Sequence, residues 1–343
     1  MKQYKLICLI LLIFILVSIV LATFIGSANI NFAQVLDIYK YKLSFFDVTI
    51  DDMGLFSIIW NIRLPRAIIA VLVGGGLALT GCIMQALTGN VMAEPYTLGI
   101  QSGAGMFAAF GIVFFARIPA LSFIGTNLFS FMGAMVAMVF VYTIASKDGM
   151  KSNSSLVLTG ISVAMLCNAV IQLIIAFAPD NAKMREIVFW TMGGLGGSHW
   201  EVIPFLLIVV IAGFIITYLL AEQLNIISMG EETAIILGIS LEKLNKILLV
   251  TVSVVVGTIV SISGSIGFVG LIIPHIVRKI TGSDHKKLIP VATLTGALFL
   301  VWADIVSRVI VAPKELPIGV LTSLVGVPFF LYIIKRKSQG VKK

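Results

Sequence analysis

Charged residues are scarce in this chain. Only 12% of its 343 residues are charged and 59% are hydrophobic, with a mean hydropathy of +1.09. A soluble globular domain carries about 25% charged residues, so this composition excludes a soluble domain, a disordered chain, a secreted disulfide scaffold and a nucleic-acid-binding protein. The net charge of +8 therefore marks the sides of a membrane and does not indicate an anionic ligand.

Cysteine, histidine and phosphate-binding motifs are also sparse or missing. The three cysteines lie in apolar runs without CxxC spacing, and the three histidines are scattered, so no metal site is expected. Neither a Gly-Lys dipeptide nor a Walker A pattern occurs, so the chain has no P-loop with which to hydrolyse ATP. The glycine clusters 74–76 and 193–197 do not join a soluble strand to a helix with a nearby lysine, and we interpret them as sites of close helix packing.

Long charge-free runs predict the membrane helices, each of which needs about 20 residues. The first run, residues 6–36, extends well past the roughly 7–15 apolar residues of a signal peptide, so we expect a retained helix. The further runs cover residues 67–93, 95–116, 118–146, 152–179, 202–221, 247–277, 288–303 and 316–335. The run 247–277 is long for one helix and short for two, and its centre at residues 263–267 is typical of a helix break.

The positions of the lysine and arginine residues decide how many helices cross the membrane. If the run 247–277 forms two helices and the N-terminus is inside, fifteen basic residues lie inside and nine outside; one helix there would give eight inside and sixteen outside. The positive-inside rule therefore predicts an all-α polytopic membrane protein. We expect a single domain, residues 1–343, with ten transmembrane helices and cytoplasmic N- and C-termini. Residues 27–62 and 180–200 would then lie outside, and residues 86–94 and 222–246 inside.

Two groups of charged residues lie near the predicted outer ends of helices. Arg63 and Arg66 flank Pro65 at the start of the second helix, where proline is well placed. These arginines suit either interfacial anchoring or docking of acidic groups, because a guanidinium matches a carboxylate in a bidentate manner. Asp304 and Arg308 are four residues apart on the ninth helix, so an intrahelical ion pair is the simplest explanation. One such pair is too little for a proton relay.

The longest predicted inside loop contains a short helix of about two turns. Ser228 is a predicted N-cap, with Glu231 three residues later as in a capping box, and Gly238 is the predicted helix end. The exposed alanine, isoleucine and leucine side chains of such a helix would be covered either by the membrane surface or by a soluble subunit.

Eight sequence blocks follow one another along the chain. They are RLPR (63–66), LVGGGLALTGCIMQALTGNVMAEPYTLGIQSGA (72–104), LVLTGIS (156–162), FWTMGGLGGSHW (189–200), LNIISMGEETAIILGIS (224–240), ISGSIGFVGLIIPHIVRKITGSDHKKLIP (262–290), ADIVSR (303–308) and ELPIGVLTSLVGVPFFLYIIKRK (315–337). In this order they resemble the FecCD-type permease subunits of ABC importers for iron–siderophore complexes, haem and cobalamin. The resemblance implies a type II importer permease fold with ten helices per subunit, in a bacterial cytoplasmic membrane.

The resemblance also implies partners and a passenger. A second permease subunit, two cytoplasmic ABC ATPases and an external substrate-binding protein would complete the importer. ATP and Mg²⁺ would be used by the ATPases, and this chain would hold no cofactor, metal or catalytic residue. The passenger would be a ferric siderophore as first choice, haem next and cobalamin third. A homodimer and a heterodimer with a paralogue remain equally open.

Three groups of functional residues follow from the resemblance. Binding-protein docking is assigned to Arg63, Arg66 and Arg308. Residues 224–240 would form the coupling-helix region, with ATPase contacts at Gly230, Glu231, Glu232, Ala234, Leu237 and Gly238. The cytoplasmic gate is assigned to Asn90, Met92, Asn153 and Ser154. The family's turn reads Asn-Pro-Leu where this chain has Asn90-Val91-Met92, so the rigidity of a proline is lost there.

Two other classes of protein are alternatives. An ion-driven secondary transporter predicts membrane-embedded carboxylates coupled to transport, for which Asp304 is the one good candidate. An intramembrane enzyme would need paired carboxylates, an HExxH motif or a serine and histidine at a shared depth, and the sequence supports none of these. The resemblance therefore implies a permease without catalysis of its own, which moves an iron complex inward at the expense of ATP hydrolysed by its partners.

Overall fold

The computed structural model describes residues 2–26, 30–42, 52–114, 119–147 and 153–340, and every regular element in those ranges is helical. The elements are α1 (Lys2–Phe24), α2 (Phe32–Lys42), α3 (Met53–Phe56), η1 (Ser57–Arg63), α4 (Leu64–Leu87), η2 (Pro95–Leu98), α5 (Ile100–Phe114), α6 (Pro119–Lys147), α7 (Asn153–Ala176), α8 (Asn181–Met192), η4 (Trp200–Val202), α9 (Ile203–Leu219), α10 (Ala221–Ile227), α11 (Glu231–Ile236), α12 (Leu241–Ser263), α13 (Val269–Thr281), α14 (His285–Val309) and α15 (Ile318–Gly340).

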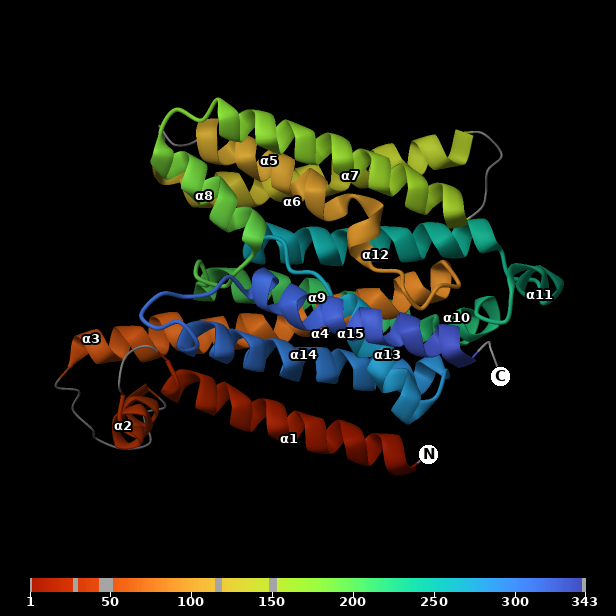
Figure 1. Cartoon of the computed structure of the whole chain (residues 1–343). Helices are drawn as coiled ribbons and strands as arrows, with labels where there is room; N and C mark the ends of the chain where they lie inside the picture. The colour runs from red at the N-terminus through yellow and green to blue at the C-terminus, as the bar shows by residue number, and fades with distance from the viewer. Residues whose placement is uncertain (1, 27–29, 43–51, 115–118, 148–152, 341–343) are drawn as a thin grey trace.

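The helices form one elongated bundle (Figure 1). The two chain termini lie at one end of it, together with α10 and α11, whereas α2 and α3 lie at the opposite end. We call these the proximal and the distal end. Helices α5 to α8 form one layer of the bundle, α1, α4, α14 and α15 belong to the other side, and α12 runs between them.

Each predicted apolar run contains an apolar helix, and the run 247–277 contains parts of two. Seven helical stretches in the described ranges are long and apolar enough to cross a membrane, and the shorter apolar helices Ile100–Phe114 and Ile318–Ile333 accompany them. The predicted break in the run 247–277 is confirmed, because α12 ends at Ser263 and α13 begins at Val269. However, α13 has 13 residues and is only about 20 Å long, which is less than the roughly 30 Å core of a bilayer.

The second predicted helix begins earlier than its charge-free run. Helix α3, the π-helical segment η1 and α4 form one continuous apolar stretch, Met53–Leu87, of 35 residues. The N–H of Leu64 bonds to the carbonyl of Ile59, which is the wider π-helical pattern. Pro65, which has no N–H to donate, follows at the point where the chain returns to an α-helix.

Glycines bring α4 and α14 into backbone contact. A Cβ atom on Gly74 would lie 2.2 Å from the carbonyl oxygen of Gly296, and one on Gly296 would lie 2.5 Å from that of Gly74. Beside them, a Cβ on Gly75 would lie 3.2 Å from Thr293. The interpretation of residues 74–76 as a packing site is therefore confirmed, and α4 becomes the buried centre of the bundle, with almost every residue from Leu64 to Leu87 inaccessible.

Large apolar side chains cover the outside of the bundle. Phe14, Val139, Leu166 and Ile208 are 57%, 62%, 60% and 65% exposed, on α1, α6, α7 and α9. Apolar surface of this extent is unfavourable in water and is stable where lipid surrounds it.

Substitution of Gly74 by alanine tests the contact between α4 and α14. The added Cβ has no space, so the helices must separate, and we expect Gly74→Ala to destabilise the protein by about 1–3 kcal/mol. Gly196→Ala is the matched control, because no atom lies within 4 Å of a Cβ at that position. Thermal unfolding in detergent measures both variants, and equal unfolding midpoints would contradict the assignment.

Candidate functional site

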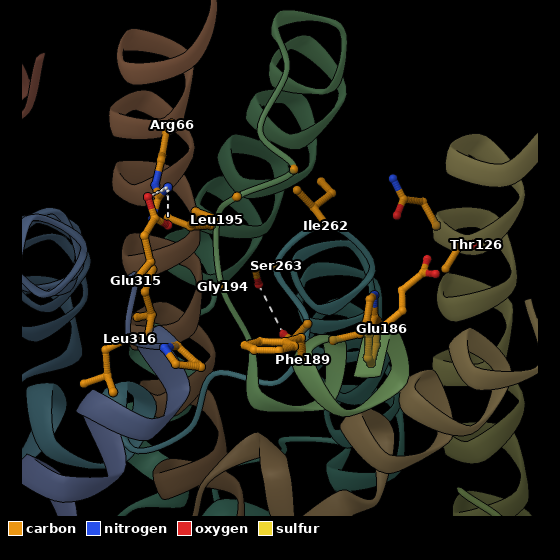
Figure 2. A pocket seen from close by; sticks show the side chains of 18 of the residues that line it. Arg66, Thr126, Glu186, Phe189, Gly194, Leu195, Ile262, Ser263, Glu315 and Leu316 are labelled. Carbon is orange, nitrogen blue, oxygen red and sulfur yellow. Dashed lines mark hydrogen bonds and ion pairs between the residues drawn. The ribbon is translucent and has the colours of Figure 1, made fainter. Parts of the chain in front are cut away.

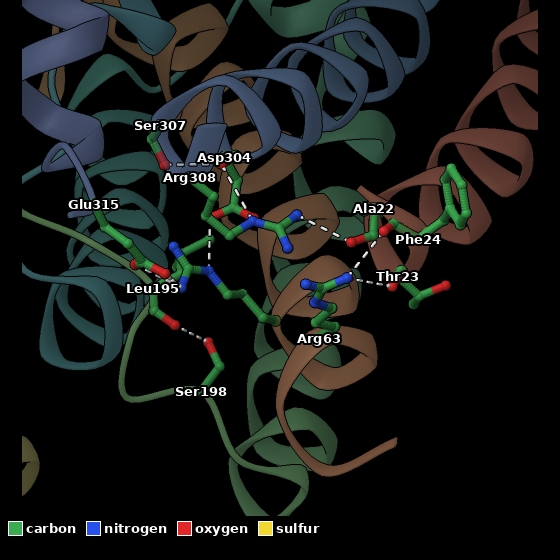
Figure 3. A network of polar contacts seen from close by, with 11 residues as sticks. Ala22, Thr23, Phe24, Arg63, Leu195, Ser198, Asp304, Ser307, Arg308 and Glu315 are labelled. Atoms are coloured by element: carbon green, nitrogen blue, oxygen red, sulfur yellow. Dashed lines mark hydrogen bonds and ion pairs between the residues drawn. The ribbon is translucent and has the colours of Figure 1, made fainter. Parts of the chain in front are cut away.

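A buried ion cluster joins α4 and α14 at the distal end (Figure 3). Asp304 is 1% exposed, and its two carboxylate oxygens are held by different arginines. Nε of Arg66 lies 2.8 Å from Oδ1, and Nε of Arg308 lies 3.1 Å from Oδ2. Nη1 of Arg66 also donates to Glu315 at 2.9 Å. Two guanidinium groups thus face two carboxylates, which removes the net charge that would be costly at membrane depth.

The cluster also holds the end of α1. Nη2 of Arg308 donates to the carbonyl of Ala22 at 3.1 Å, and Nη1 of Arg63 donates to the carbonyls of Thr23 and Phe24 at 3.0 and 2.9 Å. The carbonyls at the C-terminus of a helix have no intrahelical partner, and cations are favourable there. The arginines therefore satisfy the end of α1 and fix it against α4 and α14.

The three predicted docking arginines are therefore not exposed. Arg63, Arg66 and Arg308 are 5%, 5% and 4% exposed, and each donates to oxygen atoms of this chain. Asp304, Glu315 and the end of α1 already engage these guanidinium groups, and docking at the three arginines stays a prediction. The predicted pair of Asp304 and Arg308 is confirmed.

A cavity of about 720 Å³ lies beside the cluster (Figure 2). Arg66 and Glu315 line one side, and Glu186 and Phe189 of α8 line the other. The glycine-rich residues 193–197 and the end of α12 complete its wall. The lining thus combines aromatic and apolar surface with charges of both signs.

A second cavity of about 780 Å³ is lined by Glu94, Phe268 and the face of α15 from Gly319 to Pro328. Oε1 of Glu94 accepts from the backbone N–H of Phe268 at 2.5 Å. Phe268 is the N-cap of α13 and has a left-handed backbone with φ 68°, a strained conformation for a residue with a side chain. Glu94 therefore fixes the break between α12 and α13. Sequence reasoning missed it, because it lies in a turn predicted to face the cytoplasm.

The two cavities share a thin partition made of backbone. The N–H of Gly194 donates to the carbonyl of Ser263 at 2.8 Å. Cβ atoms on Gly264 and Gly319 would each lie 2.2 Å from a backbone carbonyl oxygen, those of Trp190 and Met192. Residues Gly193, Gly264 and Ile318 face the first cavity, whereas Met192, Ser265 and Gly319 face the second. The C-terminal ends of α8 and α12 and the start of α15 therefore meet between the two cavities.

The predicted gate turn follows α4. Asn90 is exposed and Met92 is half-buried. Oδ1 of Asn90 accepts from the N–H of Met92 at 3.0 Å, which is a local turn typical of asparagine. Asn153 begins α7, but the side chains of Asn153 and Ser154 lie outside the described residues.

The predicted coupling helix exists as α11, although its start differs from the prediction. The hydroxyl of Ser228 donates to the carbonyl of Leu224 and so ends α10, and α11 begins at Glu231 with Gly230 as its N-cap. The expected capping box is therefore wrong. The predicted end is confirmed, because the N–H groups of Gly238 and Ile239 bond to Ile235 and Ala234, both at 2.9 Å, as in a Schellman motif.

Exposure separates the predicted ATPase contacts into two sets. Ala234 is 0% exposed and packs toward its own bundle, so the expectation that it meets a partner is wrong. Leu237 is 59% exposed, and the exposed set also includes Gly230, Glu231, Glu232 and Gly238. Ile235 and Ile236, which sequence reasoning did not single out, are 62% and 84% exposed. The apolar face of α11 thus consists of three consecutive side chains directed away from the bundle.

No group of three histidine, cysteine or acidic residues that could hold a metal ion occurs among the described residues. The three cysteines are free, and Cys82 and Cys167 are buried.

Comparison with known proteins identifies relatives over nearly the whole chain. A sequence model of the FecCD transport family matches residues 11–336. The cobalamin import system permease protein BtuC of Halobacterium salinarum is 39% identical over 278 residues, which cover 81% of this chain and 73% of the relative. The hemin transport system permease protein HmuU of Yersinia pestis is 38% identical over 283 residues, or 82% of this chain and 84% of the relative.

A solved structure has the same fold. It shows a metal-chelate type ABC transporter in an inward-facing conformation, and its chain superposes with a TM-score of 0.81 at 28% identity. The superposition covers 97% of this chain and 99% of that chain.

Neutralising Asp304 tests the ion cluster. Asp304→Asn leaves two buried guanidinium groups without their shared charge, so we expect a loss of about 3–5 kcal/mol in stability. Asp37→Asn is the control, because its pair with Lys40 is exposed and such pairs contribute about 0–1 kcal/mol. Thermal unfolding in detergent compares them, and equally small shifts would show that the cluster does not hold α1, α4 and α14 together.

Proposed function

Because the chain belongs to the FecCD transport family, we propose that it carries an iron complex across a membrane, with a ferric siderophore as the first choice of passenger and haem as the next. The chain is a multi-pass ABC-transporter permease subunit and is not itself catalytic. The predicted family, membrane location and lack of catalysis are confirmed on this basis. No bound cofactor is expected in a permease of this family.

An ABC permease works with ATPase subunits and a substrate-binding protein. We propose two permease chains, alike or paralogous, two cytoplasmic ATPases that use ATP and Mg²⁺, and one external binding protein. Within this assembly the proximal end faces the cytoplasm. The positions of the basic residues support this orientation, because the positive-inside rule places both termini, α10 and α11 on the inner side. In the ten-helix topology, α13 is the short eighth segment.

The exposed face of α11 is the proposed ATPase contact. Ile235, Ile236 and Leu237 form its apolar part. Glu231 and Glu232 lie in its first turn, and Gly230 and Gly238 shape its two ends. An apolar group of this kind on an exposed six-residue helix needs a covering partner, and a cleft in a soluble ATPase would provide it.

The passenger is proposed from the relatives and the cavities together. The relatives named above transport haem or cobalamin at 38% and 39% identity, and an iron(3+)-hydroxamate permease of Bacillus subtilis is 38% identical over 287 residues. These values are too similar to distinguish the passengers. Cavities of about 720 and 780 Å³ suit a bulky chelate, since ligand pockets are typically about 300–1,000 Å³. We place both cavities on the passenger's route, and the backbone partition forms a barrier between them.

Docking of the binding protein is proposed at the distal end, around the ion cluster. Arg66 lines the first cavity together with Lys314 and Glu315. In this arrangement Arg63 and Arg308 would act by holding the cluster in place, and a docking carboxylate would have to compete with Glu315 for Arg66. The cytoplasmic gate is proposed at the turn of Asn90 and Met92 and at the start of α7, with Asn153 and Ser154.

An ion-driven carrier is the weaker alternative. It needs a carboxylate that gains and loses a proton or a cation during transport. Each carboxylate oxygen of Asp304 already contacts an arginine, at 2.8 and 3.1 Å, so this group is engaged in a structural ion pair. Glu94 is the other carboxylate deep in the fold, and it is engaged by a backbone N–H.

The observation that carries the proposed function is the family match over residues 11–336, which spans both cavities and the exposed face of α11. The experiment is uptake into proteoliposomes that contain this chain, its ATPase and its binding protein. Radiolabelled iron is supplied as a siderophore complex or as haem, and cobalamin is supplied separately. Uptake of an iron complex that requires internal ATP and the binding protein is expected. Uptake of cobalamin alone would refute the choice of passenger, and uptake driven by an ion gradient without ATP would refute the importer.

The apolar face of α11 gives a separate prediction. Ile236 is 84% exposed, so Ile236→Glu should leave the fold intact. Burying the new carboxylate against an ATPase would be unfavourable, and we expect co-purification with the ATPase and ATP-dependent uptake to fall at least about tenfold, which corresponds to roughly 1.4 kcal/mol. Ile236→Leu is the control and should retain both. Full assembly of the glutamate variant would exclude this face as the contact.

A further inference from the structure

Helices α10 and α14 meet at a polar junction at the proximal end. Nδ2 of Asn225 on α10 donates to Oδ1 of Asp284 at 3.1 Å, and Oδ1 of Asn225 accepts from the backbone N–H of His285 at 2.8 Å. Nδ1 of His285 lies 2.8 Å from the same Oδ1, and because an amide oxygen only accepts, Nδ1 carries the hydrogen. One amide thus contacts the first two residues of the α14 terminus through three polar interactions.

The other contacts of this junction are less specific. Leu224 and Ile227 of α10 are buried, and α10 packs against both α4 and α14. The ion pair between Glu222 and Lys286 is exposed, at 69% and 50%, and such pairs contribute little. Partial burial acts to raise the pKa of Asp284, but hydrogen bonds from Asn225 and Lys286 outweigh it and hold the pKa below its usual range. Asn225 therefore provides the directional contact between the two helices.

The proposed ATPase contact reaches the bundle through few elements. Helix α11 packs against α10 and α12, and its apolar side chains face away from both. A force applied to α11 by a partner therefore reaches α10 as well as α12, and Asn225 is the polar contact through which α10 can pass it to α14.

Helix α14 extends from this junction to the distal ion cluster. It has 25 residues and is about 37 Å long. Asp284 and His285 lie at its proximal end, and Asp304 and Arg308 lie near its distal end. Between them, backbone contact at Gly74 and Gly296 opposes sliding of α14 along α4, because close-packed interiors do not deform gradually.

We propose that Asn225 links the coupling segment, residues 224–240, to α14, and that α14 and α4 move as one unit that connects the ATPase contact to the Arg66–Asp304–Arg308 cluster. This proposal rests on the proposed function, because it requires a partner that moves α11. Asn225 is a positioning residue: it acts through α14 on the distal end. Coupling between two sites requires such a contiguous element that both sites can bias.

The test measures passenger taken up per ATP hydrolysed, in proteoliposomes with the assembled transporter. Asn225→Ala removes all three polar contacts and leaves Leu224 and Ile227 packed. We expect ATP hydrolysis to continue and the ratio of uptake to hydrolysis to fall at least about fivefold, the lower end of typical coupling effects. A loss of stability alone would lower both rates together and leave the ratio unchanged. Thr281→Ala is the control, because its hydroxyl bonds only to carbonyls of its own turn, Val277 and Gly282.

A second variant tests the same link from the side of α14, for the case that Asn225→Ala lowers assembly of the transporter. Asp284→Ala removes the acceptor of one of the three contacts, the bond from Nδ2 of Asn225, so it should lower the ratio in the same direction and by less. The double variant should show no further loss beyond that of Asn225→Ala, because both changes break one link. An unchanged ratio in both single variants, with an active wild type, would overturn the link and leave the importer intact. Absence of ATP-dependent uptake by the wild type would overturn the function and the link together.

Discussion

The contact between α4 and α14 is the constraint on which the rest of the bundle depends. Gly74 and Gly296 allow the two backbones to touch, and the Asp304 carboxylate, shared by Arg66 and Arg308, fixes their distal ends. Charges at this depth are stable only when they are paired, so the cluster has one favourable arrangement. That arrangement also satisfies the end of α1, and the pair of helices thereby becomes a frame against which the other helices are placed.

The two cavities and the ATPase contact lie at different places along this frame. The first cavity includes Arg66 of the distal cluster, and the second lies along α15 and the start of α13. The exposed face of α11 projects from the proximal end. An importer needs an outer entrance, a passage and an inner contact for the ATPase, and in the proposed function these follow one another from the distal to the proximal end. In the proposed mechanism, the pair of α4 and α14 transmits a displacement from one end of the bundle to the other.

Much of this fold could be predicted from the sequence, and the failures have physical causes. Apolar runs give the helices directly, because a bilayer requires about 20 apolar residues per crossing. The burial of the arginines could not be predicted, because local sequence gives no indication that Arg66 meets Glu315, 249 residues away. Ala234 and Ile236 are only two positions apart in the sequence, yet Ala234 is buried and Ile236 is 84% exposed. Helical periodicity in a helix of six residues is too short to decide which face is covered.

The most direct measurement of the central claim is a set of distances between spin labels in the assembled transporter, with and without ATP. Met229, Ile310 and Phe177 are 72%, 61% and 79% exposed, so labels at these positions should not disturb the fold. The distance from Met229 beside α11 to Ile310 at the distal end of α14 should stay constant, while the distance from Met229 to Phe177 at the end of α7 should change as the passage opens. A change in the first distance as large as that in the second would contradict a rigid frame from α10 to the distal cluster.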